Sequence, residues 1–307
     1  MIGAMSGGTG RWWRRVLGER RPSEELPAQR AAASAEAAAV SGRDAVLVFS
    51  RELYPLARRG VQRLVDTAPG WAEVFVVGFD PERPGEYDVE LATGSLRHRV
   101  YGWEDVDSLG LPVKARAKDG TLNFVPGNMD WLLYLFDRDH PGYERLWWVE
   151  DDVRFGGPWS VLLDELRVRP EGLIAPRRRS REDAPEWFWW QYASYPEGVR
   201  QLATFHPFGR VTHAALEALL QAYRDGWKGH HETFLPTVVE AAGLGVYDPV
   251  DRYTVDTFRH RPFHRPPVPQ DGRLWHPVRG ARDREQHREA KRRQRMARLE
   301  LDGGTAD

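Results

Sequence analysis

Short apolar runs separated by amphipathic stretches organise the chain from residue 44 to about residue 278. Three of these runs have the continuous apolar character of strands buried on both faces of a sheet: Ala45–Phe49, Val74–Phe79 and Leu146–Val149. Between the first two, Pro55 opens a segment with apolar positions at helical spacing. A strand–helix–strand unit of this length predicts parallel pairing. The expected fold class is α/β, a single domain with a mostly parallel central sheet flanked by helices.

The same alternation predicts the remaining elements. Asn128 is expected to cap a helix, and Pro158 to open another. Two more helices are expected, with apolar positions from Ala215 to Tyr223 and from Leu235 to Ala242. Short strands are expected at 96–103, 173–176 and, once or twice, within 246–253, while the stretch 81–95, rich in Pro, Gly and acids, is expected to be a loop. Residues 177–192 fit neither period and predict a long loop over a site.

Composition and charge narrow the class of protein. The 307 residues are 41% hydrophobic and 29% charged, which is typical of a soluble globular chain. A net charge of -1 predicts no nucleic-acid partner. The chain has no cysteine, and no apolar run resembles a signal peptide or a membrane span, so a cytoplasmic location is expected.

Both ends differ from the central domain. Residues 1–43 are predicted to be a disordered or loosely docked tail, and residues 279–307 a charged, solvated helix or tail. The stretch from Arg11 to Arg15 is basic with two tryptophans, so weak contact with an anionic membrane surface is one interpretation, and docking on the chain's own domain is the other.

Three acidic residues, Glu150, Asp151 and Asp152, close the third apolar run. Carboxylates at the end of a buried strand are costly unless they are neutralised, and a hard divalent cation such as Mg²⁺ or Mn²⁺ would neutralise them. Ligands also bind at the carboxyl ends of parallel strands. Alternation along a strand places Glu150 and Asp152 on one face and Asp151 on the other. The competing interpretation is a solvated turn.

Two later motifs carry further candidates for chemistry. Gly229-His230-His231-Glu232 opens a predicted helix, and Trp275-His276-Pro277 lies in a stretch rich in His, Pro and Arg. With the acidic triplet they occur in the order found in nucleotide-sugar glycosyltransferases of the GT-A fold, which residues 44–278 of the chain resemble. The triplet stands where that family carries its Asp-x-Asp-type metal motif, although here it is Glu-Asp-Asp, which leaves open which two acids bind the metal.

The resemblance implies transfer of a sugar from a nucleoside-diphosphate sugar to a glycan or other hydroxyl acceptor, with Mn²⁺ or Mg²⁺ as cofactor. Asp152 is the first choice of metal ligand, and Asp151 or Glu150 is either the second ligand or a contact to ribose or metal-bound water. His276 completes the metal shell or binds diphosphate, or else packs beside Pro277. Glu232 is the candidate base, or else a carboxylate that only stabilises a helix start.

Two further sets are candidates for substrate contacts. Asp80, which ends the second strand, and Arg51, which follows the first, are candidates to contact the nucleotide, although Asp80 is also a plausible turn acid. The aromatic residues of the loop and a neighbouring histidine are candidates to bind the acceptor, with a buried lid as the alternative: Trp187, Trp189, Trp190 and His231.

Two other classes of function compete. A metal-dependent phosphoester hydrolase usually needs two metals and more Asp and His ligands than this single dense cluster offers. A non-catalytic carbohydrate- or nucleotide-binding module needs neither the acidic triplet nor Glu232. The chain has no Walker-type loop and no Gly-x-Gly-x-x-Gly fingerprint, which argues against a kinase or a dehydrogenase. The sugar, the base, the acceptor and the stereochemical outcome stay open.

Overall fold

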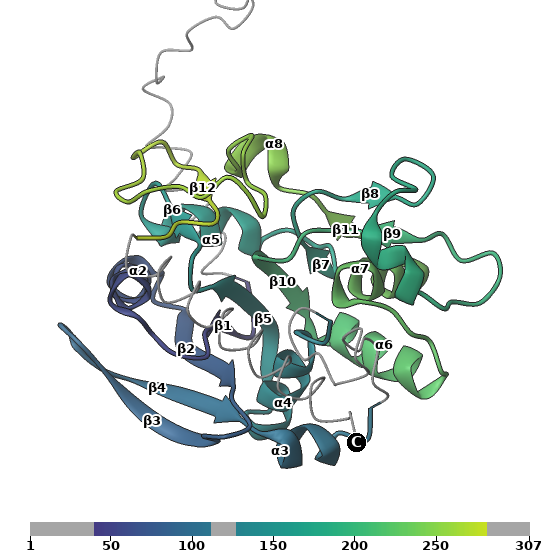
Figure 1. Cartoon of the computed structure of the whole chain (residues 1–307), viewed down its shortest axis with the longest axis horizontal. Helices are drawn as coiled ribbons and strands as arrows, with labels where there is room; N and C mark the ends of the chain where they lie inside the picture. The colour runs from purple at the N-terminus through teal and green to yellow at the C-terminus, as the bar shows by residue number, and fades with distance from the viewer. Residues whose placement is uncertain (1–39, 112–126, 281–307) are drawn as a thin grey trace, which may run out of the picture.

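The structure, a computed structural model, describes residues 40–111 and 127–280. Its centre is an eight-stranded sheet, which crosses the molecule in Figure 1. From one edge to the other the strands are β11 (Val246–Tyr247), β7 (Leu173–Ile174), β10 (Phe208–Thr212), β5 (Tyr143–Glu150), β1 (Arg43–Phe49), β2 (Ala72–Phe79), β4 (Gly94–Tyr101) and β3 (Gly85–Leu91). Only β10 and β3 run against the others, so the sheet is mostly parallel.

Helices cover both faces of the sheet. One face packs against α4 (Trp131–Asp139), α6 (His213–Arg224) and α7 (His231–Ala241), and the other against α2 (Pro55–Thr67) and α5 (Trp159–Arg167). Strand β1 supplies both cores, since Ala45 and Leu47 face the first set of helices while Val46 and Val48 face the second. The predicted fold class is therefore confirmed.

The two adjacent tryptophans of β5 anchor the strand from opposite sides. Trp147 lies in the core beneath α2 and α5, and Trp148 lies in the core beneath α4, α6 and α7. The Trp148 ring crosses Gly209 of β10, where an added Cβ would overlap the indole. A glycine at this position lets an antiparallel strand pair closely with β5, which fixes the strand that leads to the acidic triplet.

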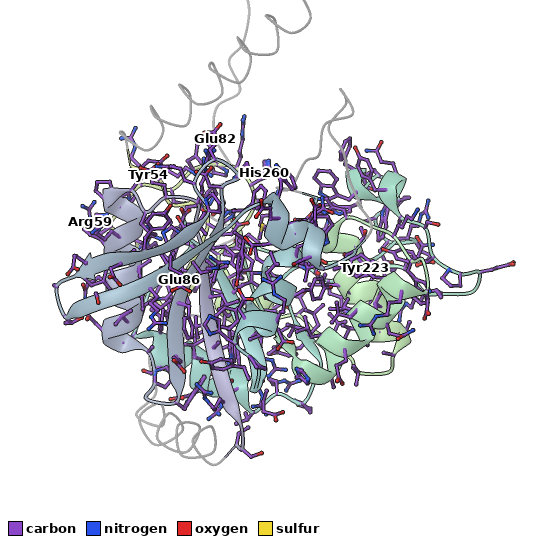
Figure 2. The ribbon with its side chains drawn as sticks, turned by 90° about the horizontal axis from the view of Figure 1, so that it is seen from below. Tyr54, Arg59, Glu82, Glu86, Tyr223 and His260 are labelled. Atoms are coloured by element: carbon purple, nitrogen blue, oxygen red, sulfur yellow. The ribbon has the colours of Figure 1, made fainter. Side chains whose placement is uncertain are left out.

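Small pairings bring distant segments to the carboxyl end of β5. Strand β12 (Leu274–Trp275) pairs with β6 (Arg154–Phe155), just after the triplet, and Val278 donates a backbone hydrogen bond to the Asp152 carbonyl at 2.8 Å. Strand β8 (Arg179–Ser180) pairs with β9 (Leu202–Ala203) and precedes the 3₁₀ helix η2 (Phe188–Tyr192). In Figure 2, Tyr54 and Glu82, which follow β1 and β2, lie on the same side of the molecule as His260.

Some expected elements were wrong. Residues 81–95 are not a loop: β3 and β4 form an edge hairpin there, and the pattern missed it because an edge strand with one buried residue, Val89, needs little apolar sequence. The segment after β11 is helical, α8 (Val250–Tyr253), and another short helix, α3 (Trp103–Ser108), follows β4. Helix α4 begins later than expected, with Asp130 rather than Asn128 at its N-cap position.

Most of the tail predictions concern residues 1–39 and 281–307, which lie outside the described part of the chain, as does the basic stretch from Arg11 to Arg15. The bounds predicted for the central domain stay predictions. In residues 40–111 and 127–280, none of the helices is both long enough and apolar enough to span a bilayer.

Candidate functional site

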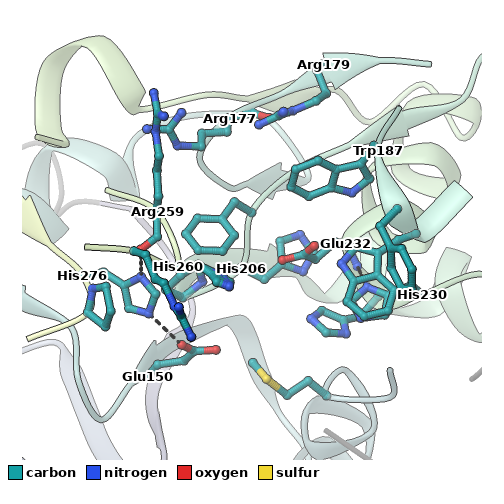
Figure 3. A pocket seen from close by; sticks show the side chains of 18 of the residues that line it. Glu150, Arg177, Arg179, Trp187, His206, His230, Glu232, Arg259, His260 and His276 are labelled. Carbon is teal, nitrogen blue, oxygen red and sulfur yellow. Dashed lines mark hydrogen bonds and ion pairs between the residues drawn. The ribbon is translucent and has the colours of Figure 1, made fainter. Parts of the chain in front are cut away.

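The end of β5 and the C-terminal segment together form a compact polar cluster. Glu150 is the last residue of β5, Asp152 follows it in the turn, and His276 comes just after β12. The His276 Nε2 atom lies 3.2 Å from Glu150 Oε2 and 3.3 Å from Asp152 Oδ1. Figure 3 shows the contact between His276 and Glu150 at one end of a cavity. Residues from distant parts of the sequence therefore meet at the carboxyl end of a central strand, which is where ligands bind in α/β folds.

Two further contacts fix the orientation of this cluster. His276 Nδ1 donates to the Arg259 carbonyl at 2.9 Å, which directs Nε2 at the carboxylates, and Arg279 Nε donates to Asp152 Oδ2 at 2.8 Å. Burial alone would raise the pKa of Asp152, but His276 and Arg279 outweigh burial and lower it to about 2. Burial alone would lower the pKa of His276, but the hydrogen bonds and charges of Asp152 and Glu150 outweigh burial and raise this pKa to about 10. Asp152 is thus ionised, and His276 and Arg279 compensate its charge.

Asp151 is not brought into this group. Its carboxylate accepts a hydrogen bond of 2.6 Å from the Ser50 hydroxyl, at the end of β1. Burial raises the pKa of Asp151 to about 7, with the charge of Asp152 adding to the effect and the Ser50 hydrogen bond opposing it. Glu150 and Asp152 therefore lie together beside His276, with Asp151 turned toward β1 between them, as strand alternation predicts.

The cluster has the donor set of a metal site. Glu150, Asp152 and His276 each offer one ligand atom, and these atoms lie within 4.8 Å of one another. Within the described ranges, this is the one group of three or more such residues that could hold a metal ion. Two carboxylate oxygens and one imidazole nitrogen suit a divalent cation, and the hydrogen bond from Nδ1 to a carbonyl is the usual support for a histidine ligand. The residues present therefore fit the expected metal.

A cavity of about 1270 Å³ opens beside the cluster and contains Glu232. Glu232 lies in the first turn of α7, where the His230 side chain accepts a hydrogen bond from its backbone N–H. The side chain is 8% exposed. Burial raises the pKa of Glu232 to about 8, with the charge of Glu150 adding to the effect and Arg179 and Trp189 opposing it. A carboxyl group that is buried in a cleft and titrates near neutral pH is suited to proton transfer.

The predicted aromatic residues do not all face the cavity. Trp187 and Trp189 line it, and Trp189 stacks on His230 with ring centroids 3.7 Å apart. Trp190 is buried and its indole donates to the Ala184 carbonyl at 2.8 Å. His231 is buried but contributes to the cavity wall. Trp187 and Trp189 are thus part of the cavity wall, whereas Trp190 is part of the core.

Asp80 and Arg51 lie apart from this cavity. The Arg51 guanidinium donates to the buried Asp80 carboxylate at 3.0 Å, and Arg83 donates to the same oxygen at 3.2 Å. Together they line a second, smaller cavity of about 230 Å³ at the ends of β1 and β2. The structure places these two residues together, but apart from the Glu150–Asp152–His276 group.

Sequence reasoning missed several residues of the site. Arg279 pairs with Asp152 although it falls just beyond the predicted end of the domain, and Ser50 holds Asp151. The cavity wall also contains arginines that had been treated only as part of a loop, Arg177 and Arg179, and one from the His-rich segment, Arg259. Four arginines between residues 177 and 181 were the available signal, because a run of like charges with no helical or strand period seldom serves packing.

No known protein-family profile and no curated protein sequence matches this chain. Several solved structures match at low identity. A glycosyltransferase involved in the glycosylation of the major capsid of PBCV-1 shares 14% identity over 81% of this chain and 99% of that one, with a TM-score of 0.35. A Bacillus anthracis protein named as a putative glucose-1-phosphate thymidylyltransferase shares 13% identity over 68% of this chain and 86% of that one, with a TM-score of 0.35.

The WbbM bifunctional glycosyltransferase shares 11% identity over 74% of this chain and 40% of that one, with a TM-score of 0.37. These TM-scores are too low to assign a function. The function of this chain is therefore inferred from the residues of its own site.

Proposed function

We propose that the chain is a metal-dependent glycosyltransferase that moves a sugar from a nucleoside-diphosphate sugar to a hydroxyl acceptor. The observation that carries the proposal is the position of the Glu150–Asp152–His276 group. It lies at the carboxyl end of a central strand and borders the same cavity as a buried glutamate with a raised pKa, Glu232. A cation site and a candidate base thus adjoin one cleft large enough for two substrates.

The cluster suits a diphosphate leaving group. When bound, Mn²⁺ or Mg²⁺ would neutralise the negative charge that develops on the diphosphate as the glycosidic bond breaks. Glu150, Asp152 and His276 are the residues that would hold the ion. Arg279 would keep the Asp152 carboxylate oriented through its 2.8 Å hydrogen bond. Asp80 and Arg51 are proposed to contact the nucleotide from the neighbouring strand ends.

Glu232 is proposed to act on the acceptor. In transfer with inversion, its carboxylate would accept the proton of the attacking hydroxyl, while Trp187, Trp189 and His231 would position the acceptor. If the enzyme retains configuration, Glu232 instead orients the substrate. Metal ligands are poor bases because their lone pairs are committed to the cation, so the base must be a separate group.

The two competing functions fit the site less well. A hydrolase of the two-metal type needs a second group of ligands, and the described residues hold one such group. A non-catalytic binding module gains nothing from a buried carboxylate whose pKa is raised to about 8. The cation site beside Glu232 therefore favours a transferase.

The test is a thermal-shift series with UDP, GDP and their diphosphate sugars, each with and without Mn²⁺. We expect a nucleotide to raise the melting temperature only when the metal is present, and to find transfer of the corresponding sugar to a hydroxyl acceptor. Stabilisation by free sugar alone, with no effect of nucleotide or metal, would instead identify a binding module. Metal-dependent phosphate release without transfer would identify a hydrolase.

A further inference from the structure

Three arginines lie along one side of the main cavity. Arg177 and Arg179 come from the segment that contains β8, and Arg259 comes from the C-terminal segment. Figure 3 shows their side chains gathered on the side of the cavity opposite Glu150. Three like charges repel one another, and an anion or a carboxylate among them would offset this repulsion.

None of the three forms an ion pair with a carboxylate in the part of the chain that the structure describes. Arginines next to them do: Arg178 Nη2 lies 3.0 Å from Glu240 Oε1, and Arg279 pairs with Asp152 at 2.8 Å. Burial lowers the pKa of Arg177 and of Arg179, and the charge of Arg259 lowers both further. The charges of Asp248 on both arginines and of Glu232 on Arg179 oppose this lowering, but no carboxylate of the described residues makes a direct ion pair with Arg177, Arg179 or Arg259.

The backbone conformation and the hydrogen bonds of Arg177 hold it in place. Arg177 has a φ of 62°, and it is the only non-glycine residue with a positive φ among residues 40–111 and 127–280. Its guanidinium donates to the carbonyls of Phe258 at 2.7 Å and Asp256 at 3.1 Å, which ties β8 to the segment that carries Arg259. Strained backbone of this kind concentrates at functional sites.

The aromatic wall continues this side of the cavity. The Arg179 guanidinium lies 4.3 Å from the centre of the Trp187 ring. The Trp187 Nε1 atom is buried without a hydrogen-bond partner among the described residues, so a polar ligand at this position would satisfy it. Arg179 also lies close enough to Glu232 to oppose the rise in its pKa.

We propose that Arg177, Arg179 and Arg259 form an anion subsite, which holds a phosphate or carboxylate group on the acceptor molecule. The inference rests on the proposed glycosyltransferase function and makes the substrate class specific: the acceptor is an anionic molecule that also carries a hydroxyl. Its hydroxyl lies toward Glu232 and its anionic group against the guanidinium groups. Arginine suits this role because its planar donors pair with phosphate and carboxylate oxygens two at a time.

The test is calorimetry on the full chain with Mn²⁺ and saturating UDP, at constant ionic strength. The probes are glucose 6-phosphate, glucuronate, glucose and inorganic phosphate. We expect one of the anionic sugars to bind about tenfold or more tightly than glucose, the scale of a hydrogen bond to a charged group. The stronger of the two anionic sugars identifies phosphate or carboxylate as the preferred group.

The double variant Arg179→Gln with Arg259→Gln should lose this preference. Arg177 is left intact because its side chain also supports the fold. Arg178→Gln is the matched control, since it removes the same charge from the same segment outside the cavity, and it should keep the preference. Equal affinity for glucose and both anionic sugars, or a preference that persists in the double variant, would overturn the subsite. Competition between inorganic phosphate and UDP would overturn it as well, by assigning the arginines to the donor.

The proposed function and the subsite fail in different ways. Sugar transfer to neutral acceptors, with an acceptor KM that the double variant leaves unchanged, would overturn the subsite and keep the glycosyltransferase. Arginine-dependent anion binding without transfer from any diphosphate sugar would overturn both the glycosyltransferase and the acceptor role of the subsite.

Discussion

Two buried carboxyl groups of the candidate site have pKa values shifted in opposite directions. His276 and Arg279 hold the pKa of Asp152 down, whereas burial raises the pKa of Glu232 to about 8. Asp152 therefore stays ionised at neutral pH. Glu232 is mostly protonated at pH 7 and becomes a carboxylate as the pH rises. Environments that separate two pKa values in this way suit the two acids to different roles.

The first prediction concerns Glu232. Glu232→Gln should lower kcat by about 10²-fold or more, the scale of a lost general base, and leave nucleotide and metal affinity unchanged. Because a base acts in its ionised form, kcat/KM of the wild-type protein should rise as the pH approaches about 8 and level off above it. The variant should lack this rise. Wild-type turnover in the variant would reduce Glu232 to a helix-start carboxylate, and a retaining enzyme should show a smaller loss.

The second prediction concerns Asp152. Asp152→Asn removes a negative charge from the metal-binding group, so Mn²⁺-dependent nucleotide binding should disappear while the fold persists. Calorimetric titration of nucleotide with and without Mn²⁺ measures the loss, and circular dichroism reports the fold. Asp107→Asn, on the exposed end of α3, is the matched control and should bind as the wild type does. Unchanged affinity in Asp152→Asn would remove this residue from the site.

Among the elements, η2 gives a prediction that separates two neighbouring tryptophans. Trp189 lines the cavity and stacks on His230, so Trp189→Ala should raise the acceptor KM more than it weakens nucleotide binding. Trp190 is 4% exposed, so Trp190→Ala should instead lower the free energy of unfolding by about 3 kcal/mol or more. Steady-state kinetics and urea unfolding of both variants distinguish these effects. Equal losses of acceptor and nucleotide binding in Trp189→Ala would show that this ring is also core.

The elements that could be predicted from the sequence are those with a strong local signal. The apolar runs of β1, β2 and β5 and the periodic faces of α6 and α7 were sufficient. Strand β10 escaped because Gly209 and Arg210 interrupt its apolar pattern. Both residues serve packing at a distance, Gly209 against the Trp148 ring and Arg210 by donating to carbonyls that follow α5. Such contacts have no local signature.

The residues of the candidate site also divide into those with a local sequence signal and those without one. Strand alternation was enough to place Glu150 and Asp152 together and Asp151 apart. The contribution of His276 came only from the order of motifs, since no period links residues 276 and 150. Arg279, Arg177 and Arg259 could not be located because their segments have little regular structure, and their positions follow from long-range hydrogen bonds. Sequence patterns therefore identified the acidic residues of the site better than the arginines and the histidine that surround them.

At the scale of the whole molecule, the Glu150–Asp152–His276 group joins two parts of very different regularity. Glu150 ends β5 of the central sheet and Asp152 lies in the turn that follows it, whereas His276 belongs to residues 256–280, where β12 is the one regular element. The same segment supplies Arg259 and Arg279 to the cavity wall. Its attachment to the sheet includes the pairing of β12 with β6 and the contacts of His276 and Arg279 with the acids.

The last prediction follows from this attachment. If Mn²⁺ binds Glu150, Asp152 and His276 together, it should slow amide hydrogen exchange in residues 256–280 much more than in β1 and β5, which are already protected by burial on both faces. The measurement is exchange mass spectrometry of the full chain with and without Mn²⁺. His276→Gln should abolish the slowing, and His213→Gln, on the exposed start of α6, should preserve it. A metal effect spread evenly over the sheet and the C-terminal segment would contradict the site, because a cation held by these three residues would link the C-terminal segment to the end of β5 and so protect that segment first.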